Sequence, residues 1–591
     1  RFTASMFSGL MFRRPQDPDI GVVEQRLLGL VEQCADPGRR LLLGCNLHIY
    51  YAACVGRHSE LERLMNALRP PDATALPPVF AVLWEALQAM RDWRHGRCAQ
   101  TISTVTRAVR LAREHGLRMW DFLLAALEVY GWINDGFADR AQLALQRFER
   151  MIEPRRKVDL AHFDYLKTLA RLVAGDGVGA LAAAESANAI ADRYGGTHQH
   201  ALGRLSLAQA LHACGRAGEA WRALESARRY GDLMQGEVLA YQSDLCEATF
   251  ALAAGDEARC AGALQRAFSI GARQDYLNHQ HFFPAEMARL CAFALEHDIV
   301  ADFARRLIDI RRLKPPRIDL PLWPWPVRIH TLGRFSLVVA GQSVSAADCL
   351  QQKKPLELLR VLIALGGREI RVSDVISEIW SAAAAATIGK RERGAFDSTL
   401  SRLRRILGAD GGPDDLVLVE DGLLRLNPDR CWVDLWCCQR LLGTVRALLD
   451  APAPPPAAEL LAPARELLRH YQGDFLAREA PLPCFTRRRD ELRQQVVTAL
   501  ADLAGALCRG SLHDEAARLF ERATAIDPCR ERLYRDWMIC LQQQGEIAEG
   551  LRVYQRCREI LADRLGSRPS AATEAVRRAL GEASGDAGER D

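Results

Sequence analysis

The sequence predicts a mainly α-helical protein, with helical repeats at both ends and a small domain of strands and helices between them. Glycines recur every 39 or 40 residues in the first half, a 34-residue period lies near the C-terminus, and the segment between them mixes strand-like and helical apolar patterns. We expect an N-terminal α-solenoid over 1–312, a proline-rich linker over 313–326, a central domain over 327–432, a C-terminal helical domain over 433–583 and a disordered tail over 584–591.

The N-terminal repeat is marked by single glycines. Each is followed by a segment with helical apolar spacing, and the series is Gly56, Gly96, Gly136, Gly175, Gly215 and Gly255. A helical pair cannot bury its apolar face alone, so about six stacked pairs would share one core and form a superhelix with a concave wall. The period and the Ala-rich helices resemble the sensor solenoid of MalT-like regulators. This resemblance implies that the solenoid receives a signal, either a small molecule or a protein.

Two His-Gln-His triplets occur in this half, at residues 198–200 and 279–281. They lie two repeats apart, which predicts equivalent positions in the solenoid. Imidazoles in such a triplet can bind a metal or a ligand. Repeat duplication with packing between helices explains them without any ligand, and this is the interpretation that we favour.

The central domain is predicted to begin with strands and then two helices. Residues 327–344 alternate or run apolar with glycines as breaks, which is typical of short antiparallel strands. Residues 354–365 carry leucines at helical spacing and end at a Gly-Gly pair. Ser373 is a candidate N-cap for a short helix over 374–380, and a loose Ala-rich connection over 382–386 follows.

The third helix of the central domain, over 394–407, has two contrasting faces. Its apolar residues fall at helical spacing and predict a buried stripe: Phe396, Leu400, Leu403 and Leu407. The opposite side collects small residues and guanidiniums, which suit close approach to a DNA groove. Residues 390–407 hold six Lys/Arg against two carboxylates, a local net charge of +4. A solvated amphipathic helix fits the same residues.

If this helix enters a major groove, its side chains divide into two groups. The base-reading candidates are Arg391, Ser398, Ser401 and Arg402, because arginine can bond guanine through two hydrogen bonds. The phosphate-binding candidates are Lys353, Lys354, Arg404, Arg405 and Arg425, whose charges would position the protein without reading sequence.

A β-hairpin is predicted after the third helix. The apolar runs LVLV at 416–419 and LLRL at 423–426 flank Glu420-Asp421-Gly422, a turn in which the glycine favours positive φ. Strands, three helices and a hairpin follow the order of a winged helix, with the third helix as the reader and the hairpin as the wing.

The central domain resembles the OmpR/PhoB-type winged helix of SARP-type bacterial transcriptional activators. The resemblance rests on LGRFSLVVAGQSV, QQKKPLELLRVLIALGGREIRVSDVISEIW, FDSTLSRLRRILG and LVLVEDGLLRLNPDRCWVD. The chain departs from the family after Trp380, where an Ala-rich stretch and KRER replace a short acidic, proline-containing loop. This departure affects where the reader helix begins.

The C-terminal domain resembles the bacterial transcriptional activator domain that accompanies this winged helix. The resemblance rests on YQGDFL at 471–476, RRRDELRQQ at 487–495 and two helical hairpins. Three pairs lie 34 residues apart, the tetratricopeptide (TPR) period: Glu515/Glu549, Ala516/Gly550 and Phe520/Tyr554. Such proteins bind direct repeats near promoters as head-to-tail protomers and recruit RNA polymerase. The resemblance therefore implies double-stranded promoter DNA and RNA polymerase as partners, with a homodimer on DNA.

Enzyme motifs are missing from the sequence. It has no GxxxxGK[ST], HExxH or GxSxG, and its seventeen cysteines show neither a CxxC pair nor the spacing of a zinc site. We therefore expect no enzymatic activity, no cofactor, no metal site and reduced, buried thiols. No apolar run is long enough to cross a bilayer and no signal peptide is evident, which predicts a cytoplasmic protein. Because the chain opens at Arg1, an upstream module that hydrolyses nucleotide can be missing.

These features predict a sequence-specific DNA-binding transcriptional activator with the solenoid as its input. The alternative is a TPR-type scaffold, in which the winged helix binds protein rather than DNA.

Overall fold

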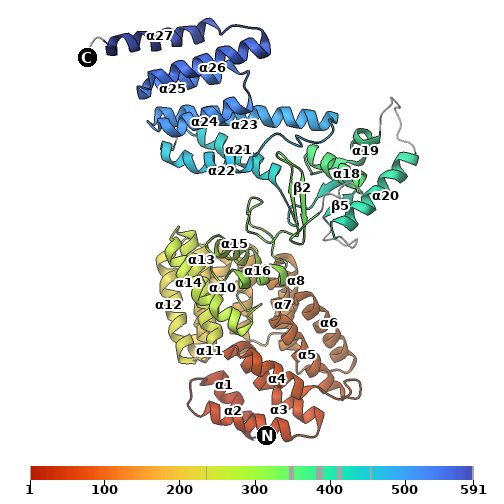
Figure 1. The fold of residues 1–591 in the computed structure, drawn as a ribbon. Coiled ribbons are helices and arrows are strands. Elements are labelled where there is room, and N and C mark those ends of the chain that lie inside the picture. The colour runs from red at the N-terminus through yellow and green to blue at the C-terminus, as the bar shows by residue number, and fades with distance from the viewer. Residues whose placement is uncertain are drawn as a thin grey trace. The chain divides into compact units, whose positions relative to one another are not determined.

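The computed structural model describes residues 2–234, 236–344, 352–380, 390–408, 416–452 and 455–588. The chain divides into two compact units (Figure 1). The first comprises residues 1–316 and 320–324, and the second comprises residues 317–319 and 325–591. The expected linker thus contributes residues to both units. Leu320 and Trp323 are buried in the first, and Asp319 pairs with Arg440 in the second.

The first unit is an α-solenoid of helical pairs. Its elements are α1 (Phe2–Arg13), α2 (Ile20–Gln33), α3 (Pro37–Ile49), the π-helical turn η1 (Tyr50–Val55), α4 (His58–Leu68), α5 (Pro78–Arg94), α6 (Cys98–Glu114), α7 (Asp121–Asn134), α8 (Ala138–Glu149), α9 (Lys157–Val173), α10 (Gly177–Tyr194), α11 (Thr197–Ala213), α12 (Ala217–Met234), α13 (Glu237–Ala253), α14 (Glu257–Gln274), α15 (Pro284–Glu296) and α16 (Ala301–Ile310). The predicted solenoid is confirmed.

The periodic glycines end the first helix of each pair. All six have positive φ, between 73° and 81°. At Gly175 the glycine N–H donates to Leu172 O at 3.0 Å and the next N–H, of Asp176, donates to Arg171 O at 2.9 Å. This pattern is a Schellman cap, which needs a left-handed residue that glycine adopts without steric strain. The repeat in the sequence is therefore a repeat of helix ends.

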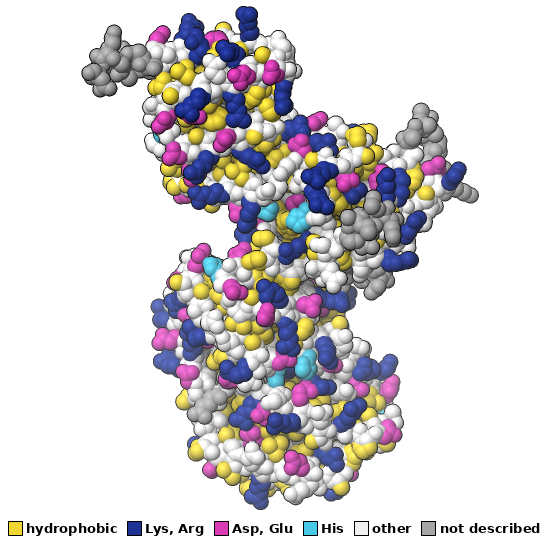
Figure 2. All heavy atoms as spheres, in the orientation of Figure 1, with side chains coloured by type: hydrophobic (Ala, Val, Ile, Leu, Met, Phe, Trp, Pro, Cys, Tyr) yellow, Lys and Arg dark blue, Asp and Glu magenta, His cyan; other side chains and the backbone are white. Residues whose placement is uncertain are grey.

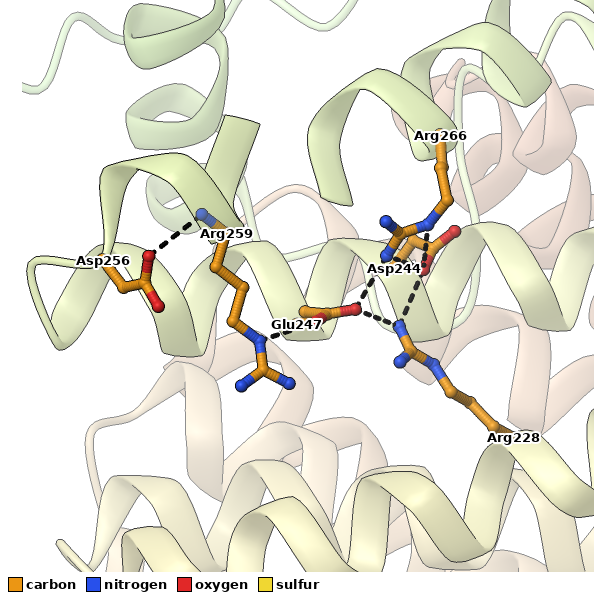
Figure 3. Close-up of polar contacts among 6 residues, drawn as sticks. All are labelled: Arg228, Asp244, Glu247, Asp256, Arg259 and Arg266. Atoms are coloured by element: carbon orange, nitrogen blue, oxygen red, sulfur yellow. Dashed lines mark hydrogen bonds and ion pairs between the residues drawn. The ribbon is translucent and has the colours of Figure 1, made fainter. Parts of the chain in front are cut away.

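An ion-pair network joins three consecutive solenoid helices (Figure 3). Asp244 and Glu247 on α13 accept from Arg228 on α12 and from Arg266 on α14, and Glu247 also accepts from Arg259 at 2.7 Å. Burial alone would raise the pKa of Glu247, but hydrogen bonds from Arg228 and Arg259 outweigh it and lower that pKa. Glu247 thus stays ionised, and the network of ion pairs fixes α12 and α14 on α13.

An extended segment, residues 276–283, runs buried between α14 and α15, and we call it the strap. Its polar groups bond to several repeats: Tyr276 Oη donates to Gly56 O at 2.7 Å, and Asn278 Nδ2 donates to Trp93 O at 2.8 Å. Asn134 Nδ2 donates to Phe282 O at 2.9 Å. A buried extended backbone needs such partners, because it forms no helix or sheet of its own. The strap therefore ties early repeats to late ones.

The two His-Gln-His triplets do not occupy equivalent positions, contrary to the prediction. Residues 198–200 lie in the first turn of α11, whereas residues 279–281 belong to the strap. The difference arises because Asp275, with φ of 58°, ends α14 and Pro284 begins α15. His281 lies between Gln209 Oε1, 2.6 Å from Nδ1, and Tyr165 Oη, 3.1 Å from Nε2.

The second unit contains the winged helix and the C-terminal helical domain. Its elements are β1 (Val327–His330), β2 (Ser336–Val339), β3 (Gln342–Ser343), α18 (Lys353–Ala364), β4 (Ile370–Arg371), α19 (Val372–Trp380), α20 (Lys390–Ile406), β5 (Val417–Glu420), β6 (Leu423–Leu426), β7 (Cys431–Val433), α21 (Asp434–Leu449), the 3-10 turn η2 (Ala457–Leu460), α22 (Leu461–His470), α23 (Pro483–Arg509), α24 (His513–Ile526), α25 (Glu531–Gln544), α26 (Ile547–Leu565) and α27 (Ala571–Gly588).

Two small sheets frame the three helices of the winged helix. One has the order β3-β2-β1-β7, with β1 antiparallel to β2 and parallel to β7. The other has the order β4-β6-β5 and is antiparallel. The hairpin turn between β5 and β6 has φ of 50° at Asp421 and 77° at Gly422, as a two-residue turn of primed type requires. The predicted winged helix is confirmed.

Three local details differ from the predictions. Ser373 is not an N-cap, because α19 begins at Val372 and Ser373 is its second residue. The serine hydroxyl donates to Asp374 Oδ1 at 3.2 Å. The reader helix α20 begins at Lys390, so KRER forms its first turn. Residues 584–588 of the expected tail are helical, since α27 continues through this segment to Gly588. The Ala-rich connection at 382–386 lies outside the described residues.

The winged helix and the C-terminal domain share one hydrophobic core. The buried carboxylate of Asp434, at the start of α21, accepts from the N–H of Thr331 and of Leu332, at distances between 2.7 and 2.9 Å. Leu476 N–H donates to Thr331 O at 2.8 Å, so the YQGDFL segment pairs with the end of β1. Burial raises the pKa of Asp434, although these hydrogen bonds oppose the rise.

The arginines of α23 complete this junction. Arg488 Nε donates to Ala364 O on α18 at 2.8 Å, and Arg489 Nε donates to Phe475 O at 2.9 Å. Arg493 pairs with Asp474. In the basic run at 487–495, Arg488 thus bonds the winged helix, whereas Arg489 and Arg493 hold the YQGDFL segment within the C-terminal domain.

Among the described residues, no helix has the length and apolar character that a bilayer span requires.

Acid should destabilise the solenoid through its buried histidines. Burial lowers the pKa of His162 and His198 to about 4 and of His281 to about 3. The unfolded chain, with imidazole pKa near 6.5, therefore binds protons first as pH falls, and stability is lost from there down toward the folded values. We expect each histidine to remove about 1 kcal/mol between pH 6.5 and pH 5.5. Thermal unfolding at about pH 7.5 and pH 5.5 measures this loss.

The matched variants for this experiment are His281→Gln and His115→Gln. His281→Gln should reduce the pH dependence of the melting temperature by the share of one histidine. His115→Gln, at an exposed side chain, should leave that dependence unchanged. An equal melting temperature of the wild-type solenoid at both pH values would contradict the prediction.

Candidate nucleic-acid interface and solenoid cavity

Helix α20 presents one buried and one exposed face. Phe396, Leu400, Leu403 and Leu407 are each at most 6% exposed and pack in the core of the second unit. Helix α18 and the hairpin strands contribute Leu362, Val417 and other residues to the same core. This burial fixes the rotation of α20 about its axis. Its opposite face therefore points to solvent.

The four base-reading candidates all lie exposed on α20. Arg402 makes its described hydrogen bonds within the helix, donating from Nη2 to Ser398 Oγ at 3.2 Å and from Nε to Ser398 O at 3.4 Å. Both bonds are long and exposed, so they can be exchanged for contacts with a base. No described carboxylate pairs with Arg391, Arg402 or Arg405. The structure thus brings Arg391, Ser398, Ser401 and Arg402 together on one accessible face.

The phosphate-binding candidates fall into different environments. Arg405 is exposed on the same face of α20. Arg425 is exposed on β6 and pairs with Glu420 on β5 at 3.2 Å. Lys354 pairs with Glu357 at 2.8 Å and its ammonium lies 5.9 Å from the Trp380 ring centroid, whereas Lys353 is exposed at the start of α18.

Arg404 differs from the other candidates, because it is a structural contact. Its Nη2 and Nε donate to Val417 O at 2.9 and 3.2 Å. At 100° per residue it lies on the flank of α20 beside the apolar stripe rather than in the basic face. It therefore holds the end of α20 to the first strand of the wing.

Cations that the sequence analysis did not single out also lie on the winged helix. Arg393 is exposed in the first turn of α20, and Arg371 is exposed on β4, opposite Leu423 of the wing. The pairing of β4 with the wing was not visible in the sequence, since β4 is only two residues long. Figure 2 shows Lys and Arg side chains over the region that α20 occupies in Figure 1.

A cavity of about 630 Å³ lies inside the solenoid. Residues of α5, α7, α9 and α11 line it, together with residues of α1, η1 and α10, and its wall is mainly apolar and aromatic, with Met90, Trp93, Phe122, Leu127, Tyr130 and Leu202. This volume is that of a typical small-molecule pocket, in the range of about 300 to 1,000 Å³. Gln280 of the strap also lines it.

A few polar groups also line the cavity. His162 Nε2 lies 3.5 Å from Tyr130 Oη, and His198 Nε2 lies 3.2 Å from Ala53 O. Burial lowers the pKa of both histidines to about 4, so both are neutral near pH 7. Trp120 Nε1 is buried and has no acceptor among the described residues. Arg13, Arg156 and Asp159 are also among the lining residues, so the cavity suits a largely apolar molecule with a few polar groups.

Comparison with known proteins identifies the C-terminal domain. Residues 433–580 match the family model of the bacterial transcriptional activator domain. The regulatory protein AfsR of Streptomyces griseus is 28% identical over 265 residues, which are 43% of this chain and 25% of AfsR. AfsR of Streptomyces coelicolor is 28% identical over 246 residues, 41% of this chain and 23% of that protein. The matched segment thus spans about a quarter of the length of these relatives.

Among solved structures, Mycobacterium tuberculosis EmbR in complex with a low-affinity phosphopeptide is 20% identical. The alignment covers 43% of this chain and 65% of EmbR, with a TM-score of 0.34. The domain match and the AfsR relatives confirm the predicted resemblance to SARP-type transcriptional activators.

Arg404→Ala should destabilise the second unit, whereas Arg405→Ala should not. Arg404 bonds a wing carbonyl, and its replacement removes both hydrogen bonds that Val417 O accepts from it. Because Arg404 is partly exposed, we expect about 1 kcal/mol in the free energy of unfolding. Urea unfolding followed by tryptophan fluorescence measures the difference. Equal stabilities of the two variants would show that the contact with Val417 contributes nothing.

Proposed function

We propose that this chain, whose residues 433–580 are a bacterial transcriptional activator domain of the SARP type, is a sequence-specific DNA-binding regulator that activates transcription. The observation that carries the proposal is the exposed basic face of α20, opposite a stripe that is buried in the winged helix. This is the geometry in which a recognition helix enters a major groove.

The proposed contacts divide between positioning and reading. Arg405, Arg425 and Lys353 bind backbone phosphates, with Lys354 and Arg404 as further contacts at the edges of the surface. Arg402, flanked by Ser398 and Ser401, reads base edges, and Arg391 reads bases near the first turn of α20. The serines are small enough to let the helix axis approach the groove.

The activator domain is proposed to contact RNA polymerase and to orient two protomers on promoter direct repeats. Its junction with the winged helix supports this proposal, because Asp434 and Arg488 bond across it. A protein contact on the activator domain is thereby linked to a defined orientation of α20.

The solenoid is proposed to receive the signal. The cavity lined by α5 and α11 supports a small and mainly apolar effector rather than a protein. An effector changes transcription only if it binds two states of the regulator unequally. His198 of α11 and Gln280 of the strap both contact Ala53 O in η1, so the cavity wall joins these three segments.

Arg402→Ala should relax sequence preference. Loss of a bidentate contact to guanine removes about 1 to 3 kcal/mol of discrimination at one base pair. Gel shifts of the full chain on the upstream region of its own operon, against a scrambled duplex, measure the ratio of specific to nonspecific affinity. Unaltered affinity and selectivity in the variant would refute the assignment of Arg402.

Arg405→Ala should weaken binding to all sequences and reduce the slope of log K against log salt by about 1, as expected for one phosphate contact. Arg405 is the cleaner test than Arg404, because Arg404 also holds the wing. If neither variant nor the wild type shows a salt-dependent preference for promoter DNA, the scaffold function becomes the better explanation.

Residues 317–591 should bind the same promoter as the full chain, since they retain the winged helix and the Asp319–Arg440 pair. If the solenoid inhibits activation until it receives its signal, this fragment should activate a promoter reporter constitutively. Its activity should then be independent of the growth condition that induces the full chain. A fragment that still responds to that condition would refute the sensor role of the solenoid.

A further inference from the structure

Three potential metal ligands from three helices meet in the activator domain. Cys508 is near the end of α23, His513 begins α24, and Cys540 lies on α25. The ligand atoms of these residues all lie within 4.8 Å of one another. Among the described residues, this is the group of Cys, His, Asp and Glu side chains whose spacing allows a shared metal ion.

The distances correspond to a tetrahedral site. His513 Nδ1 lies 3.6 Å from Cys508 Sγ and 3.8 Å from Cys540 Sγ. Zinc bonds of about 2.3 Å to sulfur and about 2.0 Å to nitrogen, at tetrahedral angles, place sulfur and nitrogen ligands about 3.6 Å apart. The three side chains thus form one face of such a tetrahedron with little rearrangement.

The remaining position has a donor nearby. Gln543 Oε1 lies 3.1 Å from Cys508 Sγ and comes from α25, one turn after Cys540. Cys508 and His513 are partly exposed, so water can also reach the site. Either an amide oxygen or a water molecule then provides the fourth ligand.

We propose that Cys508, His513 and Cys540 bind one zinc ion, which holds the turn between α23 and α24 against α25. Two thiolates and an imidazole favour a thiophilic divalent ion over magnesium or calcium. On binding, both thiols release a proton and the two thiolates neutralise the charge of the ion, so affinity decreases as pH falls.

The sequence predicts no metal site, because four and twenty-six residues separate these ligands along the chain. Those separations match no familiar zinc motif. The ligands meet only because α23, α24 and α25 stack as repeats. The inference concerns the activator domain itself and does not depend on DNA binding.

Cobalt titration of the reduced full chain tests the site, with a non-thiol reductant present. We expect one Co²⁺ per chain, thiolate-to-cobalt charge-transfer absorption and the intense visible bands of tetrahedral cobalt, all displaced by Zn²⁺. Zinc should also raise the melting temperature of the wild type. Cys508→Ser and His513→Gln should each abolish the stoichiometric spectrum and the thermal shift.

The matched control is Cys529→Ser, a half-buried cysteine outside the cluster, which should keep both signals. Cys508 is the better target than Cys540, because Cys540 is buried and its replacement can disturb packing. Absence of thiolate-to-cobalt absorption in the folded wild type would overturn the proposal. Persistence of the full signal in Cys508→Ser and His513→Gln would overturn it too, since other cysteines would then be the ligands.

Discussion

The winged helix depends on the burial of one stripe of α20. Phe396, Leu400, Leu403 and Leu407 enter the core that α18 and the wing strands complete. Removing these side chains from water favours one rotation of the helix about its axis. That rotation, rather than any special property of the arginines, is what leaves Arg402 and Arg405 exposed. Arg404, at the edge of the stripe, then anchors the wing.

A shared hydrophobic core also joins the winged helix to the activator domain. The carboxylate of Asp434 bonds the end of β1, and the YQGDFL segment pairs with the same strand end. Arg488 and Arg489 of α23 bond carbonyls on both sides of this junction. Backbone groups that would otherwise be buried without partners are satisfied only when the two domains are docked. These contacts hold the activator domain in one orientation relative to the winged helix that contains α20.

In the first unit, the strap joins segments that are distant in the sequence, as the shared core does in the second unit. Solenoids usually have contacts between adjacent repeats only, so their ends move independently. Here Tyr276 bonds Gly56 and Asn278 bonds Trp93, far away in the sequence. The strap therefore joins repeats that are distant in the sequence, and its Gln280 also lines the cavity. This arrangement suits the input role that we propose for the solenoid.

The sequence by itself determined the helical repeats, the order of the winged helix and the two faces of α20. Each depends on local spacing: glycines at helix ends, apolar residues at 3.6-residue intervals and an Asp-Gly turn in the hairpin. The tertiary structure decided what depends on residues distant in the chain. It assigned Arg404 and the α23 arginines to structural bonds, placed one histidine triplet in the strap, and brought Cys508, His513 and Cys540 together. No local pattern encodes such meetings, because they arise from how whole helices stack.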